Sequence, residues 1–154
     1  MAVLFIRKDD DPILRKTSRE VTEITPRIQV LIDDMIETMH KANGCGLAAV
    51  QIGVLRRIVV IEVEEGETFV LINPVIVSKK GKQEEREGCL SLPNRWGITR
   101  RPMTVTVRAL DRDGTPFELT GSGLLARAIC HETDHLDGRL FTDVQIREVS
   151  PDEE

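Results

Sequence analysis

Two histidines and a glutamate near the carboxyl end of the chain have the spacing of a metal site. In the segment Cys130-His131-Glu132-Thr133-Asp134-His135 the histidines are four residues apart. On a helix they would lie about 40° apart around the axis and about 6 Å apart along it, so both imidazoles could reach one ion. Glu132 would lie beside the same face, where it could move protons on a bound water. The alternative is a surface helix with an incidental pair of histidines.

A third ligand must come from elsewhere, because a catalytic zinc-like site takes three protein ligands and leaves one position open. Downstream of the histidines the candidates are the carboxylates of Asp137, Asp143 and Glu148. Upstream, the thiol of Cys89 in Glu87-Gly88-Cys89-Leu90-Ser91 is a better candidate. The downstream choice would suit an ordinary zinc endopeptidase.

Three segments of the chain resemble, in order and spacing, the signature motifs of the peptide deformylase family. They are Gly44-Cys45-Gly46-Leu47-Ala48-Ala49-Val50-Gln51, Glu87-Gly88-Cys89-Leu90-Ser91 and His131-Glu132-Thr133-Asp134-His135. The resemblance covers nearly the whole chain, from Asp11-Pro12 to Leu140-Phe141. It implies hydrolysis of the N-formyl group from the formyl-methionine that begins newly synthesised bacterial-type proteins, with release of formate.

The resemblance also implies a metal site. Cys89, His131 and His135 would hold one divalent ion, which would lower the pKa of its water enough to supply hydroxide near neutral pH. One thiolate and two imidazoles suit Zn²⁺, and also iron, nickel or cobalt. The resemblance implies Fe²⁺ as the physiological metal, with loss of activity in air.

Three further residues would act in catalysis. Glu132 would take the water proton and return it to the departing amine, as general base and general acid. The side chain of Gln51 and, by resemblance, the backbone N–H of Leu90 would stabilise the oxyanion.

The remaining candidates would bind the substrate peptide. Glycines on either side of Cys45 could let another backbone approach or adopt positive φ, although they could also form only a turn. The resemblance implies that this strand binds the peptide as an added strand. Apolar residues near the metal would accept the methionine side chain. The substrate-binding candidates are Gly44, Cys45, Gly46, Gly88, Leu124, Ala128 and Trp96.

Two acidic residues and one further cysteine lie in or near the motifs. Asp134 and Glu87 could pair with Arg101 or orient a ligand histidine, and they could equally be surface charges. Cys130 points off the ligand face, so we interpret it as a small buried hydrophobic residue.

Two other functions are compatible with the motifs. One is an endopeptidase that uses the His-Glu-x-x-His face with a downstream acidic ligand. The other is an inactive module that binds formyl-peptides in an added-strand groove. Retention of every residue that the reaction needs argues against the inactive module.

The histidine pair requires a helix, and the flanking residues predict one from about Leu124 to Leu136. Gly121-Ser122-Gly123 precedes it and Gly138 closes it. A long N-terminal core helix is predicted to begin at Thr25-Pro26 and to end at Asn43-Gly44. Its apolar face consists of Ile28, Leu31, Ile32, Met35, Ile36 and Met39.

The segments between these helices have the composition of short antiparallel strands. Residues 57–63 and 68–72 predict a hairpin, and residues 74–79 predict a separate strand after Asn73. Residues 104–110 alternate as a half-buried strand should, with a short partner at 117–119. We therefore predict an α+β fold, in which antiparallel sheets pack around a C-terminal metal-binding helix, with a long N-terminal core helix.

Length and charge limit the function further. A chain of 154 residues with 40% hydrophobic residues is long enough for one catalytic domain, expected over 1–148, followed by a short acidic tail at 149–154. A net charge of −5 argues against a nucleic-acid substrate. Three widely spaced cysteines fit reduced thiols, and the apolar run at 2–6 is too short for a signal peptide or a membrane span.

We therefore expect a cytoplasmic monomer that acts on formyl-methionyl nascent chains. The acidic tail makes ribosome docking through the carboxyl end doubtful, which leaves a transient contact through another surface.

Overall fold

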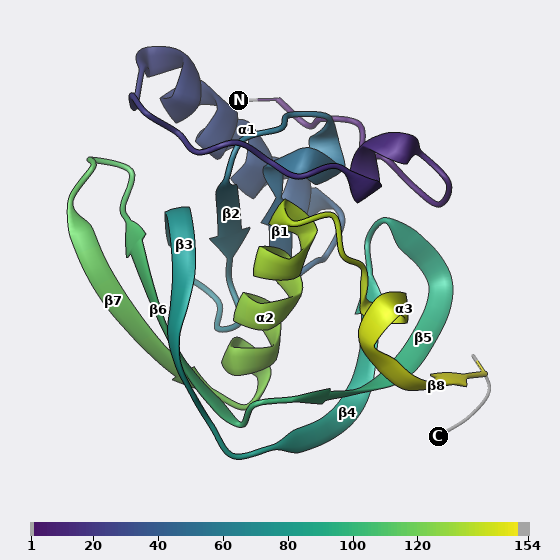
Figure 1. Ribbon diagram of the computed structural model, residues 1–154. Helices are drawn as coiled ribbons and strands as arrows, with labels where there is room; N and C mark the ends of the chain where they lie inside the picture. Colours follow the sequence, from purple (N-terminus) through teal and green to yellow (C-terminus); the bar gives the residue numbers. More distant parts are fainter. Residues whose placement is uncertain (1, 151–154) are drawn as a thin grey trace.

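The computed structural model describes residues 2–150, in which two antiparallel sheets surround a central helix (Figure 1). In chain order the elements are η1 (Pro12–Arg15), α1 (Pro26–Lys41), β1 (Gly46–Ala48), η2 (Ala49–Ile52), β2 (Ile58–Ile61), β3 (Phe69–Lys80), β4 (Gln83–Cys89), β5 (Leu92–Arg101), β6 (Thr104–Leu110), β7 (Pro116–Ser122), α2 (Leu124–Leu136), α3 (Phe141–Val144) and β8 (Gln145–Val149), where η denotes a 3₁₀ helix.

Helix α2 lies between the two sheets (Figure 1). One sheet has the strand order β1-β2-β3-β6-β7 and the other has the order β4-β5-β8. Every pair of neighbouring strands is antiparallel. The five-stranded sheet begins at the edge strand β1, which contacts α2 and has a strand partner on one side only. This arrangement confirms the predicted α+β fold of antiparallel sheets around a C-terminal helix.

Helix α1 begins and packs as its sequence predicts. The side chain of Thr25 accepts a hydrogen bond from the backbone N–H of Ile28 at 3.2 Å, and Pro26 is the first helical residue. Met35 and Met39 are fully buried against one face of the five-stranded sheet. The helix ends at Lys41, and Asn43 then takes a left-handed conformation with φ of 57°.

Helix α2 buries one side against the five-stranded sheet. Ile129 and Leu136 are fully buried in a cluster with residues of β2, β3 and β6. Beyond the helix, Gly138 has φ of +76°, and a Cβ there would lie 2.4 Å from the backbone oxygen of Arg15. Only glycine fits this position, which holds the end of α2 against η1.

The structure differs from the sequence prediction in the strands. The two predicted strands at 68–72 and 74–79 are parts of one strand, β3, which begins at Phe69 and continues through Asn73 with φ of 53° and a shift in register. The Asn73 side chain bonds both backbone groups of Val21 at 2.9 Å, which ties the N-terminal segment to the sheet. The predicted strand at 117–119 is longer, Pro116–Ser122.

The carboxyl end contains two elements that the sequence did not predict, α3 and β8. Strand β8 extends through Val149, which pairs with Trp96 of β5. Of the tail expected at 149–154, residues 151–154 lie outside the described residues. No helix within residues 2–150 is long and apolar enough to cross a membrane.

The Thr25 cap yields a prediction about stability. Thr25→Ala should lower the free energy of unfolding by about 1 kcal/mol, because one of the first backbone N–H groups of α1 loses its acceptor. Urea denaturation followed by circular dichroism would measure the change. Thr22→Ala is the control, since Thr22 is exposed and precedes the helix. Equal stability of the two variants would contradict a capping role for Thr25.

Candidate metal and active site

Three potential ligand atoms from two elements meet beside α2. Helix α2 contributes His131 and His135, and the end of β4 contributes Cys89. The Cys89 Sγ lies 3.4 Å from the His135 Nε2, which lies 3.2 Å from the His131 Nε2. All three ligand atoms are within 4.8 Å of one another.

Two of the three separations fit a tetrahedral ion. Zinc-like bond lengths of about 2.3 Å to sulfur and about 2.05 Å to nitrogen imply an S···N separation of about 3.6 Å and an N···N separation of about 3.3 Å. The two measured separations are within a few tenths of an ångström of these values. A thiolate and two imidazoles are also ligands that divalent transition metals favour.

The carboxylates downstream of the histidines lie in exposed ion pairs instead. Each pairs with an arginine at the surface: Asp137 with Arg57, Asp143 with Arg15 and Glu148 with Arg95. This geometry disfavours the endopeptidase alternative, which needs one of them as the third ligand.

Glu87 holds His131 in place from the side away from the ligand atoms. The Glu87 Oε2 lies 2.5 Å from the His131 Nδ1, and both side chains are buried. The same carboxylate accepts hydrogen bonds from Thr99 at 2.7 Å and from Arg101 at 2.8 and 3.2 Å. Arg101 also donates to Asp134 at 2.7 Å. Of the alternatives for Glu87 and Asp134, the structure therefore shows the pairing with Arg101, and Glu87 also contacts a histidine.

These contacts determine which nitrogen of His131 carries a proton. Burial by itself raises the pKa of Glu87, but hydrogen bonds from His131 and Arg101 outweigh it and hold that pKa well below its usual value. Glu87 is thus a carboxylate that accepts the Nδ1–H of His131. The Nε2 lone pair then points toward Cys89 and His135, as a metal ligand requires.

Glu132 is the second buried carboxyl group, and its environment differs from that of Glu87. Its side chain is 4% exposed, and its Oε1 has no hydrogen-bond partner among residues 2–150. Burial raises its pKa to about 7, against the opposing charge of His131. A carboxyl group that titrates near neutral pH can both accept and return a proton.

Three glycines of the motifs make room for side chains of the site. A Cβ on Gly46 would lie 2.5 Å from the Glu132 Oε2, and one on Gly44 would lie 2.6 Å from the Leu90 Cδ1. A Cβ on Gly88 would lie 2.4 Å from the Trp96 ring. Neither Gly44 nor Gly46 has positive φ. In the structure these glycines therefore allow side chains of the chain itself to come close.

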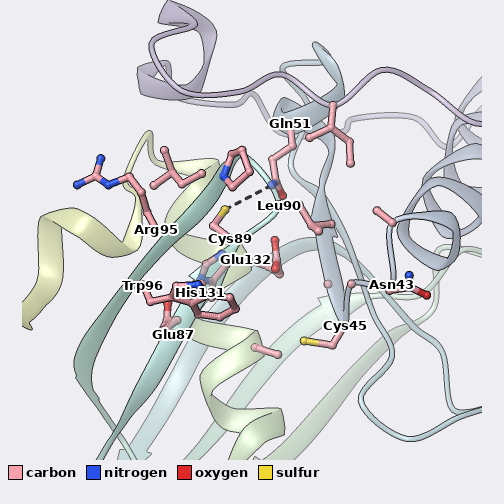
Figure 2. Close-up of a pocket in the computed structure, with 18 of the residues that line it drawn as sticks. Asn43, Cys45, Gln51, Glu87, Cys89, Leu90, Arg95, Trp96, His131 and Glu132 are labelled. Carbon is pink, nitrogen blue, oxygen red and sulfur yellow. Dashed lines mark hydrogen bonds and ion pairs between the residues drawn. The ribbon is translucent and has the colours of Figure 1, made fainter. Parts of the chain in front are cut away.

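Gln51 points its amide toward the ligand atoms (Figure 2). Its Oε1 accepts a hydrogen bond from the backbone N–H of Ala48 at 2.9 Å, and its Nε2 donates to Ser91 at 3.0 Å. The same Nε2 lies 3.7 Å from the Cys89 Sγ. Sequence reasoning gave Ser91 no role, although it is in the Cys89 motif. Ser91 and Ala48 together fix which end of the amide faces the site.

A cavity of about 520 Å³ connects these groups to solvent. It is lined by Gln51, Cys89, Leu90, His131 and Glu132, and by all seven substrate-binding candidates, namely Gly44, Cys45, Gly46, Gly88, Leu124, Ala128 and Trp96. His135 is fully buried and is not part of the lining. Trp96 and Leu124 are exposed, and Cys130 is buried in the core, as the sequence predicted.

A partly buried cysteine and two buried histidines beside a glutamate, at the base of an open cavity, are the arrangement expected of a metal-dependent hydrolase. A sequence model of the polypeptide deformylase family matches residues 3–150 of the chain. The chain is 55% identical over 148 residues to a peptide deformylase of Alkaliphilus metalliredigens, covering 96% of this chain and 100% of that protein. It is 56% identical over 153 residues to a peptide deformylase of Acetivibrio thermocellus, covering 99% and 89%.

Solved structures of peptide deformylases have a similar fold. A peptide deformylase from Legionella pneumophila matches with a TM-score of 0.91 at 46% identity, covering 97% of this chain and 88% of that one. A peptide deformylase from Synechococcus elongatus in complex with actinonin matches with a TM-score of 0.90 at 39% identity, covering 94% and 79%. The chain belongs to the polypeptide deformylase family, metal-dependent hydrolases that remove the N-formyl group from nascent peptides.

The contact between Glu87 and His131 yields a prediction about metal affinity. Glu87→Gln should weaken metal binding roughly 10- to 100-fold. A neutral amide lacks the negative charge that pairs with Arg101 and that strengthens the hydrogen bond from the His131 Nδ1–H. Competition with a chromophoric chelator would measure the affinity. Glu84→Gln is a matched control, since Glu84 lies on the same strand and pairs with Arg100 at the surface. Unchanged affinity in Glu87→Gln would contradict the role assigned to this carboxylate.

Proposed function

We propose that deformylation in this chain takes place at the site formed by Cys89, His131 and His135, with Glu132 as general base and general acid. One observation carries the proposal. Three potential ligand atoms within 4.8 Å of one another lie next to a buried carboxyl group whose oxygen lacks a partner among the described residues. The formyl group would enter through the cavity that these groups line.

In the proposed reaction, a bound divalent ion supplies Lewis acidity that brings the pKa of a water close to 7. Glu132 accepts the proton of the attacking water and returns it to the departing amine. The Gln51 Nε2–H that faces Cys89 and the backbone N–H of Leu90 donate hydrogen bonds to the oxyanion that develops from the formyl oxygen. Water adds to the formyl carbon, the carbon–nitrogen bond breaks, and formate and the free amine leave.

The peptide would bind along β1. This edge strand pairs only with β2, so its other edge can bond an added strand through main-chain groups. Gly44, Gly46 and Gly88 line the same cavity, and Cys45, Leu124, Ala128 and Trp96 would surround the unbranched methionine side chain. Because Gly46 of β1 lies against the Glu132 side chain, a peptide in this position would bring its formyl group near the proposed general base.

We further propose Fe²⁺ as the physiological ion, with Zn²⁺, Ni²⁺ or Co²⁺ able to occupy the same ligands. Three free cysteines among the described residues fit a reducing compartment, which supports a cytoplasmic location. A nascent-chain substrate supports a transient contact with the ribosome, and the enzyme would act as a monomer.

A formate-release assay on formyl-Met-Ala tests the function. The protein loaded with Fe²⁺ should release formate, a chelator should abolish the release, and added Fe²⁺ should restore it. Cys89→Ala should lose both metal and activity, since two imidazoles alone do not complete the ligand set. Cys130→Ala, which removes a thiol from the core, is the control and should keep both. No formate from the metal-loaded protein would overturn the proposal.

The role of Glu132 is tested by its removal. Glu132→Ala should lower kcat by on the order of 100- to 10,000-fold with the metal still bound, because no other group lies ready to transfer the proton. Metal analysis of the same sample separates this loss from loss of the ion. Glu118→Ala, at an exposed position on β7, should remain near normal. Near-normal turnover by metal-loaded Glu132→Ala would show that the proton is handled elsewhere.

A further inference from the structure

The charged side chains that line the active-site cavity without being buried are all positive. Lys8, Arg86, Arg95 and Arg127 line it, and we call these four residues the cationic mouth. The whole chain carries a net charge of −5, so this local excess opposes the overall charge. Figure 2 shows Arg95 and Trp96 across the cavity from Cys45 and Asn43.

The acidic residues of the lining do not offset the mouth. Glu87 and Glu132 are 7% and 4% exposed, and Glu87 is paired with Arg101. Glu148, which lies outside the lining, pairs with Arg95 at 3.2 Å, but the two side chains are 46% (Arg95) and 60% (Glu148) exposed. An ion pair exposed to this extent is weak, so a carboxylate on a bound peptide could compete with Glu148 for Arg95.

Two of the four cations are held in place by neighbouring groups. The guanidinium of Arg86 lies 5.0 Å from the centre of the Trp96 ring. Arg127 donates to the backbone oxygen of Arg86 at 3.2 Å. Arg127 is one helical turn before His131 on α2, so its charge lies beside the residues proposed to receive the methionine.

The substrate itself suggests what the mouth binds. Its first residue is formylated and carries no charge, so any charge must come from later residues. In an extended peptide the side chains two and three residues beyond methionine lie roughly 7 and 10 Å from it, since each residue adds about 3.3 Å. Charges closer together than the Debye length, about 8 Å to 10 Å at physiological salt, still attract one another, and a concave wall of one sign concentrates the field.

We propose that the cationic mouth selects formyl-methionyl peptides with acidic side chains in the residues that follow the methionine. This selectivity rests on the proposed function, because it presumes a peptide on β1 with its formyl group at the ligand atoms. Nucleic acid is a less suitable partner, since the cations line the cavity that leads to those atoms rather than a convex face.

The test compares three amidated peptides, formyl-Met-Ala-Glu-Glu, formyl-Met-Ala-Gln-Gln and formyl-Met-Ala-Lys-Lys, by formate release from the metal-loaded protein. At about 10 mM salt, kcat/KM should be roughly 10-fold higher for the Glu peptide than for the Lys peptide, with the Gln peptide between them. At about 1 M salt, where the Debye length is about 3 Å, the three values should converge. Equal values at low salt, or a preference for the Lys peptide, would overturn the proposal.

A matched pair of variants separates the mouth from net charge. Arg95→Gln should reduce the Glu/Lys ratio about 2-fold, whereas Arg108→Gln should not change it. Arg108 forms an equally exposed pair with Glu118, outside the cavity. Equal effects of the two substitutions would assign the preference to net charge and contradict the proposal.

Turnover of the Gln peptide distinguishes a failure of the selectivity proposal from a failure of the proposed deformylase function. If the Gln peptide releases formate but the ratio is near 1, the mouth is not selective and the deformylase assignment stands. If no peptide releases formate, the proposed function fails first, and the selectivity fails with it.

Discussion

The metal site depends on a buried carboxylate that joins the three-stranded sheet to the central helix. Glu87 of β4 contacts His131 of α2 while Arg101 of β5 bonds both Glu87 and Asp134. A buried ion pair is a poor source of net stability, because removing both charges from water costs nearly as much as their attraction returns. What the network supplies here is position: it sets the distance between β4 and α2, and hence brings the Cys89 thiol to the histidines.

Two carboxyl groups beside α2 have pKa values that are shifted in opposite directions. Glu87 accepts several hydrogen bonds and an ion pair, and its pKa lies well below the usual value. Glu132 is buried with an oxygen unpartnered among the described residues, and its pKa rises to about 7. A permanent anion can orient a ligand, whereas a group that titrates near neutral pH can transfer a proton. Different environments thus give two chemically identical side chains different tasks.

Local sequence signals predicted the elements that carry the site. Flanking glycines gave the bounds of α2, and Thr25-Pro26 gave the start of α1, because caps and φ restrictions act over a few residues. Local sequence signals did not predict the secondary structure of segments whose conformation depends on tertiary contacts. The short elements α3 and β8 are too brief for a periodic pattern, and the long strand β3 passes through Asn73 because that side chain bonds Val21. The sequence left Glu87 and Asp134 either as partners of Arg101 or as surface charges, and the fold decides for the pairing.

The glycines show why motif spacing revealed the site before its geometry was known. Sequence alone indicated that Gly44 and Gly46 permit a close approach and that Gly88 belongs to the site, but it could not say which side chains approach them. The structure supplies the answer for each: Leu90, Glu132 and Trp96 occupy the space that a Cβ would fill. A side chain on Gly46 would displace the carboxyl group of Glu132. The glycines therefore act through the catalytic side chains as much as through the peptide strand, which explains why they accompany the ligand motifs in one chain.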